Sequence, residues 1–146
     1  MLLSCSDDKS VKLWDIEKAT ITVNFPEHKA EVLSCKFTPD GTCVAGASID
    51  GTIKVWDTRL SKLIQHYNAH DGAINQIAFH PLGCHMGSVS NDNKIKIWDL
   101  KKGTLDWTLY GHTGEIKSLN FSQKGDYFAT GGSDKLVMVW MTNFDK

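Results

Sequence analysis

The sequence predicts an all-β protein assembled from repeated units of four short antiparallel strands. Three observations lead to this prediction. One pattern of residues returns every 42 positions, apolar and polar residues alternate within each unit, and turn-forming residues separate the apolar runs. A fixed period of this kind is typical of repeat architectures, in which each unit buries its apolar face only by stacking on its neighbours.

The repeat is clearest in the tryptophans, which stand 42 residues apart, with an aspartate after each of the first three. Several other residue types return at the same interval, and chance does not place so many of them in one register. The repeated residues are Trp14, Trp56, Trp98 and Trp140; His28, His70 and His112; Phe37, Phe79 and Phe121; Gly41, Gly83 and Gly125; and Asp8, Asp50, Asp92 and Asp134.

Within a unit, the alternation has the period of two that is expected of a strand. The run Ile53-Lys54-Val55-Trp56 is one example, and β-branched residues are frequent in such runs. Turn sequences such as Thr38-Pro39-Asp40-Gly41 lie between them. In the second unit we expect strands at about 31–37, 42–47, 52–56 and 63–67, and no segment has the spacing of a helix.

Four-stranded units of this length, with Gly-His and Trp-Asp dipeptides, resemble the blades of WD40 β-propellers over essentially the whole chain. Gly111-His112 keeps the first dipeptide, whereas Glu27-His28 and Ala69-His70 keep only its histidine. The resemblance implies about three and a half four-stranded blades. They are a partial blade with the later strands only at 1–26, WD40 blades at 27–68 and 69–110, and a blade lacking its outer strand at 111–146.

Closed propellers typically need about 4–8 blades, and an open arc leaves strand edges bare. We therefore expect these residues to be the C-terminal half of a larger ring of roughly seven blades. The remainder of that propeller would then be one of the chain's partners.

The resemblance also implies a buried chain of hydrogen bonds in each blade, linking a histidine, a hydroxyl, an aspartate and the tryptophan. A buried indole N–H needs an acceptor, and such a polar chain is tolerable only when every member is bonded. The first, truncated unit supplies Ser6, Asp8 and Trp14, and in the last unit Gly132 stands where the hydroxyl is expected. The structural tetrads are expected to be His28, Ser48, Asp50 and Trp56; His70, Ser90, Asp92 and Trp98; and His112, Asp134 and Trp140.

A catalytic reading of these Ser, His and Asp residues is not favoured. The set recurs at a fixed period, whereas a catalytic site is single, and no Gly-x-Ser-x-Gly turn surrounds the serines. There is no Gly-rich phosphate loop, so no cofactor is expected. We therefore predict a non-enzymatic protein with no catalytic or cofactor-binding residues.

The cysteines and the remaining histidines do not predict a metal site. Cys5, Cys35, Cys43 and Cys84 form no Cys-x-x-Cys pair and no disulfide framework, which fits a reducing intracellular compartment. Cys35 matches apolar residues of the other units and is expected to be a small buried hydrophobe. His80 and His85 lie near a turn and are expected to be surface or turn residues.

Charge and hydropathy exclude two classes of partner. The net charge of −1 argues against a dedicated nucleic-acid binder. No apolar run approaches the roughly 20 residues of a membrane helix, and the first residues lack the features of a signal peptide. We therefore expect no nucleic-acid and no membrane partner.

In propellers, the loops before the first strand and after the second strand of each blade crowd one face around the axis. We expect partners to bind there or, as the alternative, on the outer rims of the blades, where Trp107 lies on an outer strand. Ile49 stands out because it is apolar in a turn where the other units have Asp7, Asn91 and Ser133, although it could instead pack against the adjacent loop. The candidate residues are Lys29, Glu31, Ile49, Asp71, Asn91, Thr113, Glu115 and Ser133.

Two local segments, 62–70 and 131–145, resemble the proteome-of-centriole family of WD40 proteins, which is found in centrioles and basal bodies. The resemblance implies a structural scaffold of triplet microtubules that binds tubulin or other centriole-wall proteins, stabilises the centriole and supports cilium assembly. It also implies a location in the cytoplasm and cytoskeleton, at the centriole and the cilium basal body.

An alternative comes from the run Trp56-Asp57-Thr58-Arg59. It resembles the short box by which some propellers dock on cullin-RING ubiquitin ligases as substrate receptors. Arg59 is the only arginine in the chain.

Overall fold

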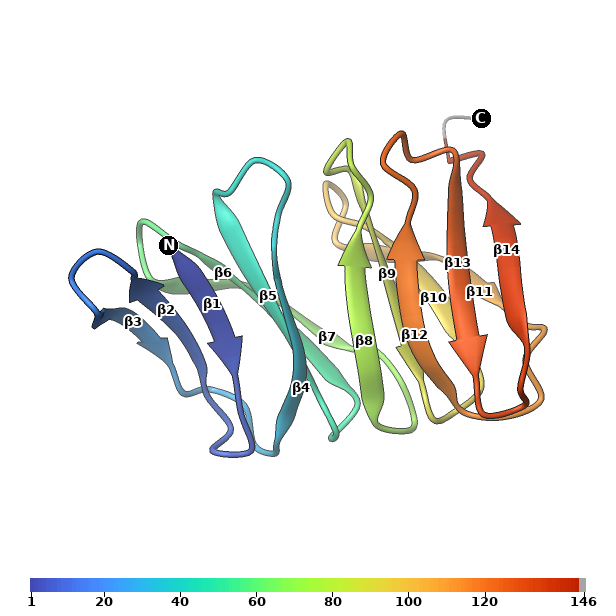
Figure 1. Cartoon of the computed structure of the whole chain (residues 1–146), viewed down its shortest axis with the longest axis horizontal. Coiled ribbons are helices and arrows are strands. Elements are labelled where there is room, and N and C mark those ends of the chain that lie inside the picture. Colours follow the sequence, from blue (N-terminus) through green and yellow to red (C-terminus); the bar gives the residue numbers. More distant parts are fainter. Residues whose placement is uncertain (145–146) are drawn as a thin grey trace.

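The computed structural model describes residues 1–144, which form fourteen strands in four antiparallel sheets. This confirms the all-β prediction (Figure 1). Within these residues there is no helix that is long and apolar enough to cross a membrane. Residues 145 and 146, the end of the predicted last unit, lie outside the described residues.

In each sheet the strands lie side by side in chain order. The first sheet contains β1 (Leu2–Cys5), β2 (Val11–Asp15) and β3 (Thr20–Phe25), and the second contains β4 (Val32–Phe37), β5 (Cys43–Ser48), β6 (Thr52–Asp57) and β7 (Lys62–Asn68). The third contains β8 (Ile74–Phe79), β9 (His85–Ser90), β10 (Ile95–Asp99) and β11 (Thr104–Leu109), and the fourth contains β12 (Ile116–Phe121), β13 (Tyr127–Gly132) and β14 (Val137–Met141).

The strands of the second sheet begin and end within one residue of the positions expected from the sequence. In the first three sheets, the pairing with the outer strand shifts register next to the tryptophan, so that one extra residue bulges from the outer strand. A bulge bends and twists the strand that carries it. The extra residues are Thr22, Ile64 and Asp106.

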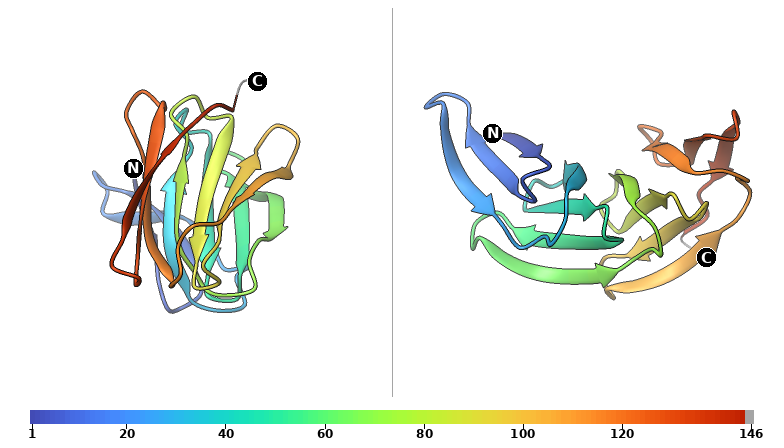
Figure 2. Two further views of the ribbon diagram at one scale, coloured as in Figure 1. Left: turned by 90° about the vertical axis from the view of Figure 1, so that its right-hand side faces the viewer. Right: turned by 90° about the horizontal axis from the view of Figure 1, so that it is seen from below.

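The four sheets stand side by side along an arc. Strands β1, β4, β8 and β12 lie along its inner side, and the long strands β3, β7 and β11 form its outer side (Figure 2, right). This is the arrangement of blades in a propeller, with about three and a half blades present. In the register of the repeat, β1 corresponds to the second strand of a complete sheet, and the fourth sheet has no outer strand among the described residues.

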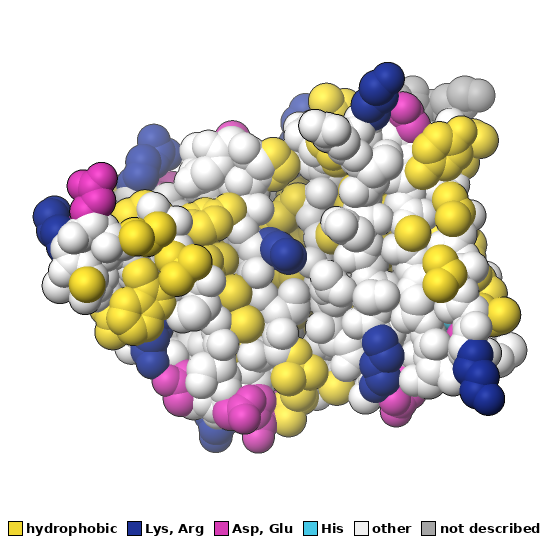
Figure 3. Space-filling view, in the orientation of Figure 1, with side chains coloured by type: hydrophobic (Ala, Val, Ile, Leu, Met, Phe, Trp, Pro, Cys, Tyr) yellow, Lys and Arg dark blue, Asp and Glu magenta, His cyan; other side chains and the backbone are white. Residues whose placement is uncertain are grey.

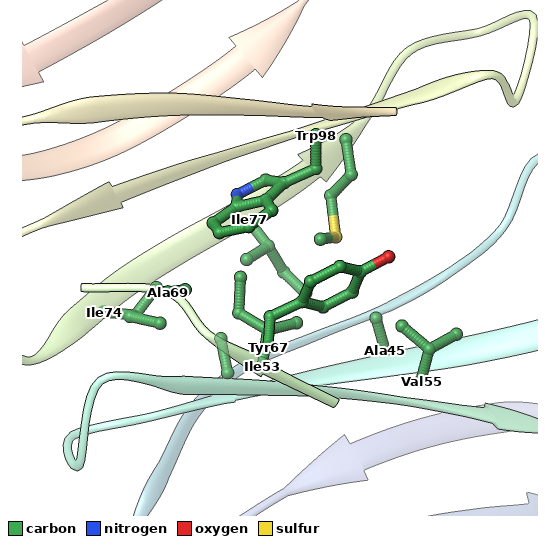
Figure 4. Packing of buried hydrophobic residues seen from close by; sticks show 10 residues of the cluster. Ala45, Ile53, Val55, Tyr67, Ala69, Ile74, Ile77 and Trp98 are labelled. Carbon is green, nitrogen blue, oxygen red and sulfur yellow. The ribbon is translucent and has the colours of Figure 1, made fainter. Parts of the chain in front are cut away.

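The hydrophobic core is divided among the interfaces between neighbouring sheets. Between the second and third sheets, Ile53 and Tyr67 pack against Ile77 and Trp98 (Figure 4). Full burial of one such side chain stabilises the fold by about 1.5–3 kcal/mol. The same positions are buried in each successive interface because the apolar residues repeat with the sheets.

The exposed face of the last sheet shows how strongly the stacking of sheets buries apolar side chains. Val137 is 78% exposed, whereas its equivalents Val11, Ile53 and Ile95 are fully buried. The difference arises because no further sheet covers β14 in the described residues. Hydrophobic side chains gather there, at the right of Figure 3, and over the first sheet at the left.

Candidate partner-binding site

Backbone hydrogen bonds hold together the two loops that were expected to form a binding face. In the second sheet, Ile49 N donates to Glu31 O at 3.0 Å, and in the fourth, Ser133 N donates to Glu115 O at 2.8 Å. The third sheet repeats the contact from Asn91 N to Ala73 O at 3.0 Å. These loops lie along the lower edge of Figure 1, the side that faces the viewer in the right panel of Figure 2.

The turn between the second and third strands has one conformation in every sheet. Lys9, Gly51, Asn93 and Lys135, at equivalent positions, all have φ between 63° and 80°. At Gly51 a side chain is also excluded by contact, because a Cβ would lie 2.2 Å from the carbonyl oxygen of His70. The two residues that precede this position in the turn therefore have the same placement in every sheet.

We call the eight candidate residues the binding face. The side chain of Ile49 is 38% exposed, so it is presented to solvent rather than covered by the adjacent loop. Glu31 and Asn91 are half-buried. The exposed members are Lys29, Ile49, Asp71, Thr113, Glu115 and Ser133.

Charged groups of both signs surround the binding face. Lys94 Nζ lies 3.2 Å from a carboxylate oxygen of Asp71, and Lys117 Nζ lies 2.6 Å from one of Glu115. Figure 3 shows acidic and basic side chains along this lower edge. Exposed ion pairs add little stability, but a pattern of charges selects partners of complementary charge.

Beneath the binding face, the third sheet contains a complete hydrogen-bond chain. Trp98 Nε1 donates to Ser88 Oγ at 2.9 Å, and Ser88 Oγ lies 2.8 Å from His70 Nε2. His70 Nδ1 lies 2.9 Å from Asp92 Oδ2. Because the indole can only donate, the hydroxyl donates its own proton to Nε2, and Nδ1–H then donates to the carboxylate.

Burial and the hydrogen bond between His70 and Asp92 shift the pKa of both residues. Burial lowers the pKa of His70, so the neutral imidazole is favoured. Burial alone would raise the pKa of Asp92, but the hydrogen bond from His70 holds it below its ordinary value. Ser88 Oγ is fully buried and bonded on both sides, which puts it out of reach of a substrate.

The fourth sheet has the same chain, with a threonine as the hydroxyl. Trp140 Nε1 donates to Thr130 Oγ1 at 3.0 Å, and Thr130 Oγ1 lies 2.8 Å from His112 Nε2. His112 Nδ1 lies 2.8 Å from Asp134 Oδ2. The expected position of the hydroxyl, at Gly132, was therefore wrong, because the hydroxyl comes from Thr130, two residues earlier on the same face of the strand.

The assignment of Ser48 and Ser90 to the tetrads was also wrong, because both serines bond within the turn that follows them. Ser90 Oγ accepts the N–H of Asp92 at 3.1 Å, and Ser48 Oγ accepts that of Asp50 at 3.3 Å. Ser6 makes the equivalent bond to Asp8 N at 3.2 Å. These serines stabilise the turn. In the third and fourth sheets, the imidazole instead reaches the hydroxyl that lies two residues earlier in the strand.

The second sheet lacks its tetrad hydroxyl because Gly46 occupies the position of Ser88. His28 Nε2 is buried without a hydrogen-bond partner, and Trp56 Nε1 donates instead to Glu27 Oε2 at 2.7 Å. Burial and the nearby Lys54 ammonium lower the pKa of His28 to about 4. Asp50 is also diverted, because its Oδ1 accepts the Thr52 hydroxyl at 2.6 Å.

The first sheet keeps the tryptophan end of the chain. Trp14 Nε1 donates to Ser4 Oγ at 2.8 Å, so Ser4, and not Ser6, occupies the hydroxyl position. Asp8 accepts hydrogen bonds from the Ser10 hydroxyl at 2.6 Å and from Lys12 at 2.5 Å.

One group of the described residues could offer three ligand atoms to a metal ion. Atoms of His85, Asp99 and Asp106 lie within 4.8 Å of one another. However, Asp99 already accepts two turn N–H groups and pairs with Lys102 at 3.1 Å. His80 and His85 are both buried, at 7% exposure, so neither lies at the surface, although His80 does stand at a turn, where its carbonyl accepts the N–H of Gly83.

An arc of antiparallel sheets of three or four strands, with a His–hydroxyl–Trp chain under one crowded loop face, defines the class of β-propeller repeat proteins. Comparison with protein families gives the particular family. The model of the WD domain, G-beta repeat, matches residues 1–15, 19–57, 61–99 and 103–141. The matches cover most of the chain, which therefore belongs to the WD40 repeat family. No match was found among curated proteins.

The matched repeats and the sheets differ by one strand. The match at 19–57 begins with β3, the outer strand of the first sheet, and ends with β6 of the second. Each of the repeats at 19–57, 61–99 and 103–141 therefore supplies the outer strand of one sheet and three strands of the next. This overlap links neighbouring sheets through the chain itself.

Proposed function

We propose that this chain is a WD40 interaction scaffold that holds a protein partner on the binding face. WD40 domains generally mediate protein–protein interactions, and the observation that carries the choice of surface is Ile49. Its side chain is 38% exposed at the end of the strands, on the same loop face as the ion pairs of the third and fourth sheets. An exposed apolar residue with a charged surround is typical of the centre of a binding surface.

We further propose that the partner is tubulin or another protein of the centriole wall. The scaffold would then be a structural component of triplet microtubules that stabilises centrioles and basal bodies and supports cilium assembly. The support is the resemblance of residues 62–70 and 131–145 to the proteome-of-centriole family. In the first of these segments, Leu63 and Ile64 on β7 are 41% and 50% exposed. The distinctive residues therefore include surface positions, which fold stability alone does not explain.

The location of the tagged chain in dividing ciliated cells tests this proposal. We expect a focused signal on centrioles and basal bodies that persists after cytoplasmic microtubules are depolymerised by a drug. A nuclear or diffuse signal, at an expression level where the chain is folded, would contradict the centriolar role and leave only the general scaffold function.

A second function is a substrate receptor of a cullin-RING ubiquitin ligase. The observation that favours it is the exposure of the Arg59 side chain, 75%, with only a long contact of 3.6 Å to Asp57. The guanidinium is thus free to bind a partner. Copurification with a cullin adaptor, abolished by Arg59→Ala and kept by Lys62→Ala, would support this function.

A further inference from the structure

Two cysteines from different sheets occupy a position at which neighbouring sheets touch. Cys5 ends β1, Cys35 lies in β4, and both belong to the apolar cluster between the first and second sheets. In the next two interfaces the equivalent residues pair in the same way within one buried cluster. Those pairs are Ala47 with Ile77, and Val89 with Leu119. The register of the repeat therefore brings Cys5 and Cys35 together.

The local structure agrees with the register. Just after Cys5, the carbonyl of Ser6 accepts the N–H of Val32 at 3.2 Å, which ties β1 to the start of β4. Both cysteines are free thiols, half-buried, and they line one groove on the inner side of the arc together with Lys36. They are therefore close to each other and accessible to a small reagent.

The surroundings make the two thiols unequal. A hydrogen bond with the Cys35 thiol, opposed by burial and assisted by the Lys36 ammonium, lowers the pKa of Cys5. The same contact, together with burial, raises the pKa of Cys35. Since the thiolate is the nucleophile in thiol chemistry, Cys5 is the more reactive of the two.

We propose that Cys5 and Cys35 form a redox pair, which a hydroperoxide converts into a disulfide that joins the first sheet to the second. The Cys5 thiolate attacks one peroxide oxygen, the O–O bond breaks, and the sulfenic acid of Cys5 forms. With hydrogen peroxide, the hydroxide that leaves takes up the proton lost by Cys5 and becomes water.

The Cys35 sulfur then attacks the sulfur of Cys5. The S–S bond forms, and the sulfenic hydroxyl leaves with the Cys35 proton as a second water. Two thiols have lost two electrons in total, and one peroxide has been reduced. The disulfide closes a loop that contains β2 and β3, and so holds the first sheet in place at the end of the described arc.

The test is graded oxidation of the intact folded chain by hydrogen peroxide, followed by alkylation of the remaining thiols and mass mapping. We expect a loss of two hydrogens, about 2 Da, and a linked pair of peptides that contain Cys5 and Cys35. The midpoint temperature of unfolding should rise by about 5 °C or more and return to its first value after reduction by dithiothreitol.

Two variants serve as controls. The Cys43→Ser/Cys84→Ser double variant should still form the link, because neither residue takes part. Cys5→Ala should abolish it, and alanine is the residue that the repeat places at the equivalent position 47. The proposal is wrong if the folded wild-type chain, checked by circular dichroism, gives no Cys5–Cys35 link. Links to Cys43 or Cys84, or oxidation of Cys5 to sulfinic acid alone, would contradict it equally.

Discussion

At the scale of the residue, the position of one hydroxyl decides whether a sheet has a complete hydrogen-bond chain. The sequence offers two sets of candidates, both in register with the repeat. Ser6, Ser48 and Ser90 form one set, and Ser4, Ser88 and Thr130 form the other. Each set has a glycine in one unit, and both lie on the same face of a strand. Sequence spacing could not show which of the two sets bonds to the histidine. The outcome depends on how far the imidazole extends into the sheet.

The two sets respond differently to removal of the hydroxyl. Ser88→Ala leaves His70 Nε2 and Trp98 Nε1 buried without partners and should lower the free energy of unfolding by about 2–4 kcal/mol. Ser90→Ala removes one acceptor of a turn N–H and should cost about 1 kcal/mol or less. Urea unfolding of both variants checks this, and an equal or reversed order would contradict the assignment of Ser88.

The incomplete chain of the second sheet can be tested by adding its hydroxyl. A Cβ at Gly46 would lie 2.8 Å from Val11 Cγ2 and 3.1 Å from His28 Nε2. Gly46→Ala and Gly46→Ser share this crowding, but only serine can donate to Nε2. We expect the serine variant to be more stable than the alanine variant by about 1 kcal/mol in urea unfolding. Equal stability would show that the unpaired nitrogen is not costly.

His28 also gives stability a dependence on pH. Burial, with the Lys54 ammonium, lowers its pKa from 6.5 to about 4 in the folded chain, so the unfolded chain binds this proton more tightly. Stability therefore falls as pH falls from about 7 to about 4, by on the order of 3 kcal/mol from this residue. In unfolding measured across this range, His28→Gln should remove that part of the slope, whereas His66→Gln at an exposed position should keep it. An unchanged slope in His28→Gln would contradict the account.

At the scale of the element, the strands were largely predictable because a period of two is a strong local signal. The bulges opposite the tryptophans were not, since Thr22, Ile64 and Asp106 share no residue type. The hydrogen bonds of the buried Lys54 and the half-buried Lys96 were also missed. Lys54, 8% exposed, donates from Nζ to Glu27 O, and Lys96 donates to Ala69 O. Each lysine ties the third strand of a sheet to the segment that leads into that sheet.

This role of the lysines predicts a contrast between equivalent positions. Lys54→Met leaves the carbonyl of Glu27 without its donor and should lower the free energy of unfolding by about 1–2 kcal/mol. Lys12→Met removes only an ion pair with the exposed Asp8 and should change it by less than about 0.5 kcal/mol. Chemical unfolding of the two variants measures the contrast, and similar losses would argue against a specific role for Lys54.

At the scale of the whole molecule, the repeat predicted which surfaces meet. Stacking of identical sheets places equivalent apolar positions in each interface and brings equivalent loops to one end. The binding face was therefore predictable as a set. Details that break the repeat were not predictable, such as Glu27 as the acceptor for Trp56 or the contact of Cys5 with Cys35. They depend on side chains that differ between units.

The measurement that tests the central claim most directly is cosedimentation of the purified chain with microtubules. Ile49→Asp is compared with Leu82→Asp, which changes an apolar turn residue that is even more exposed, 69% against 38%, at the opposite end of the strands. The account predicts that the wild type and Leu82→Asp pellet alike, and that Ile49→Asp binds about tenfold or more weakly. Full binding by Ile49→Asp would contradict the choice of the binding face, and no pelleting of the folded wild type would contradict tubulin as the partner.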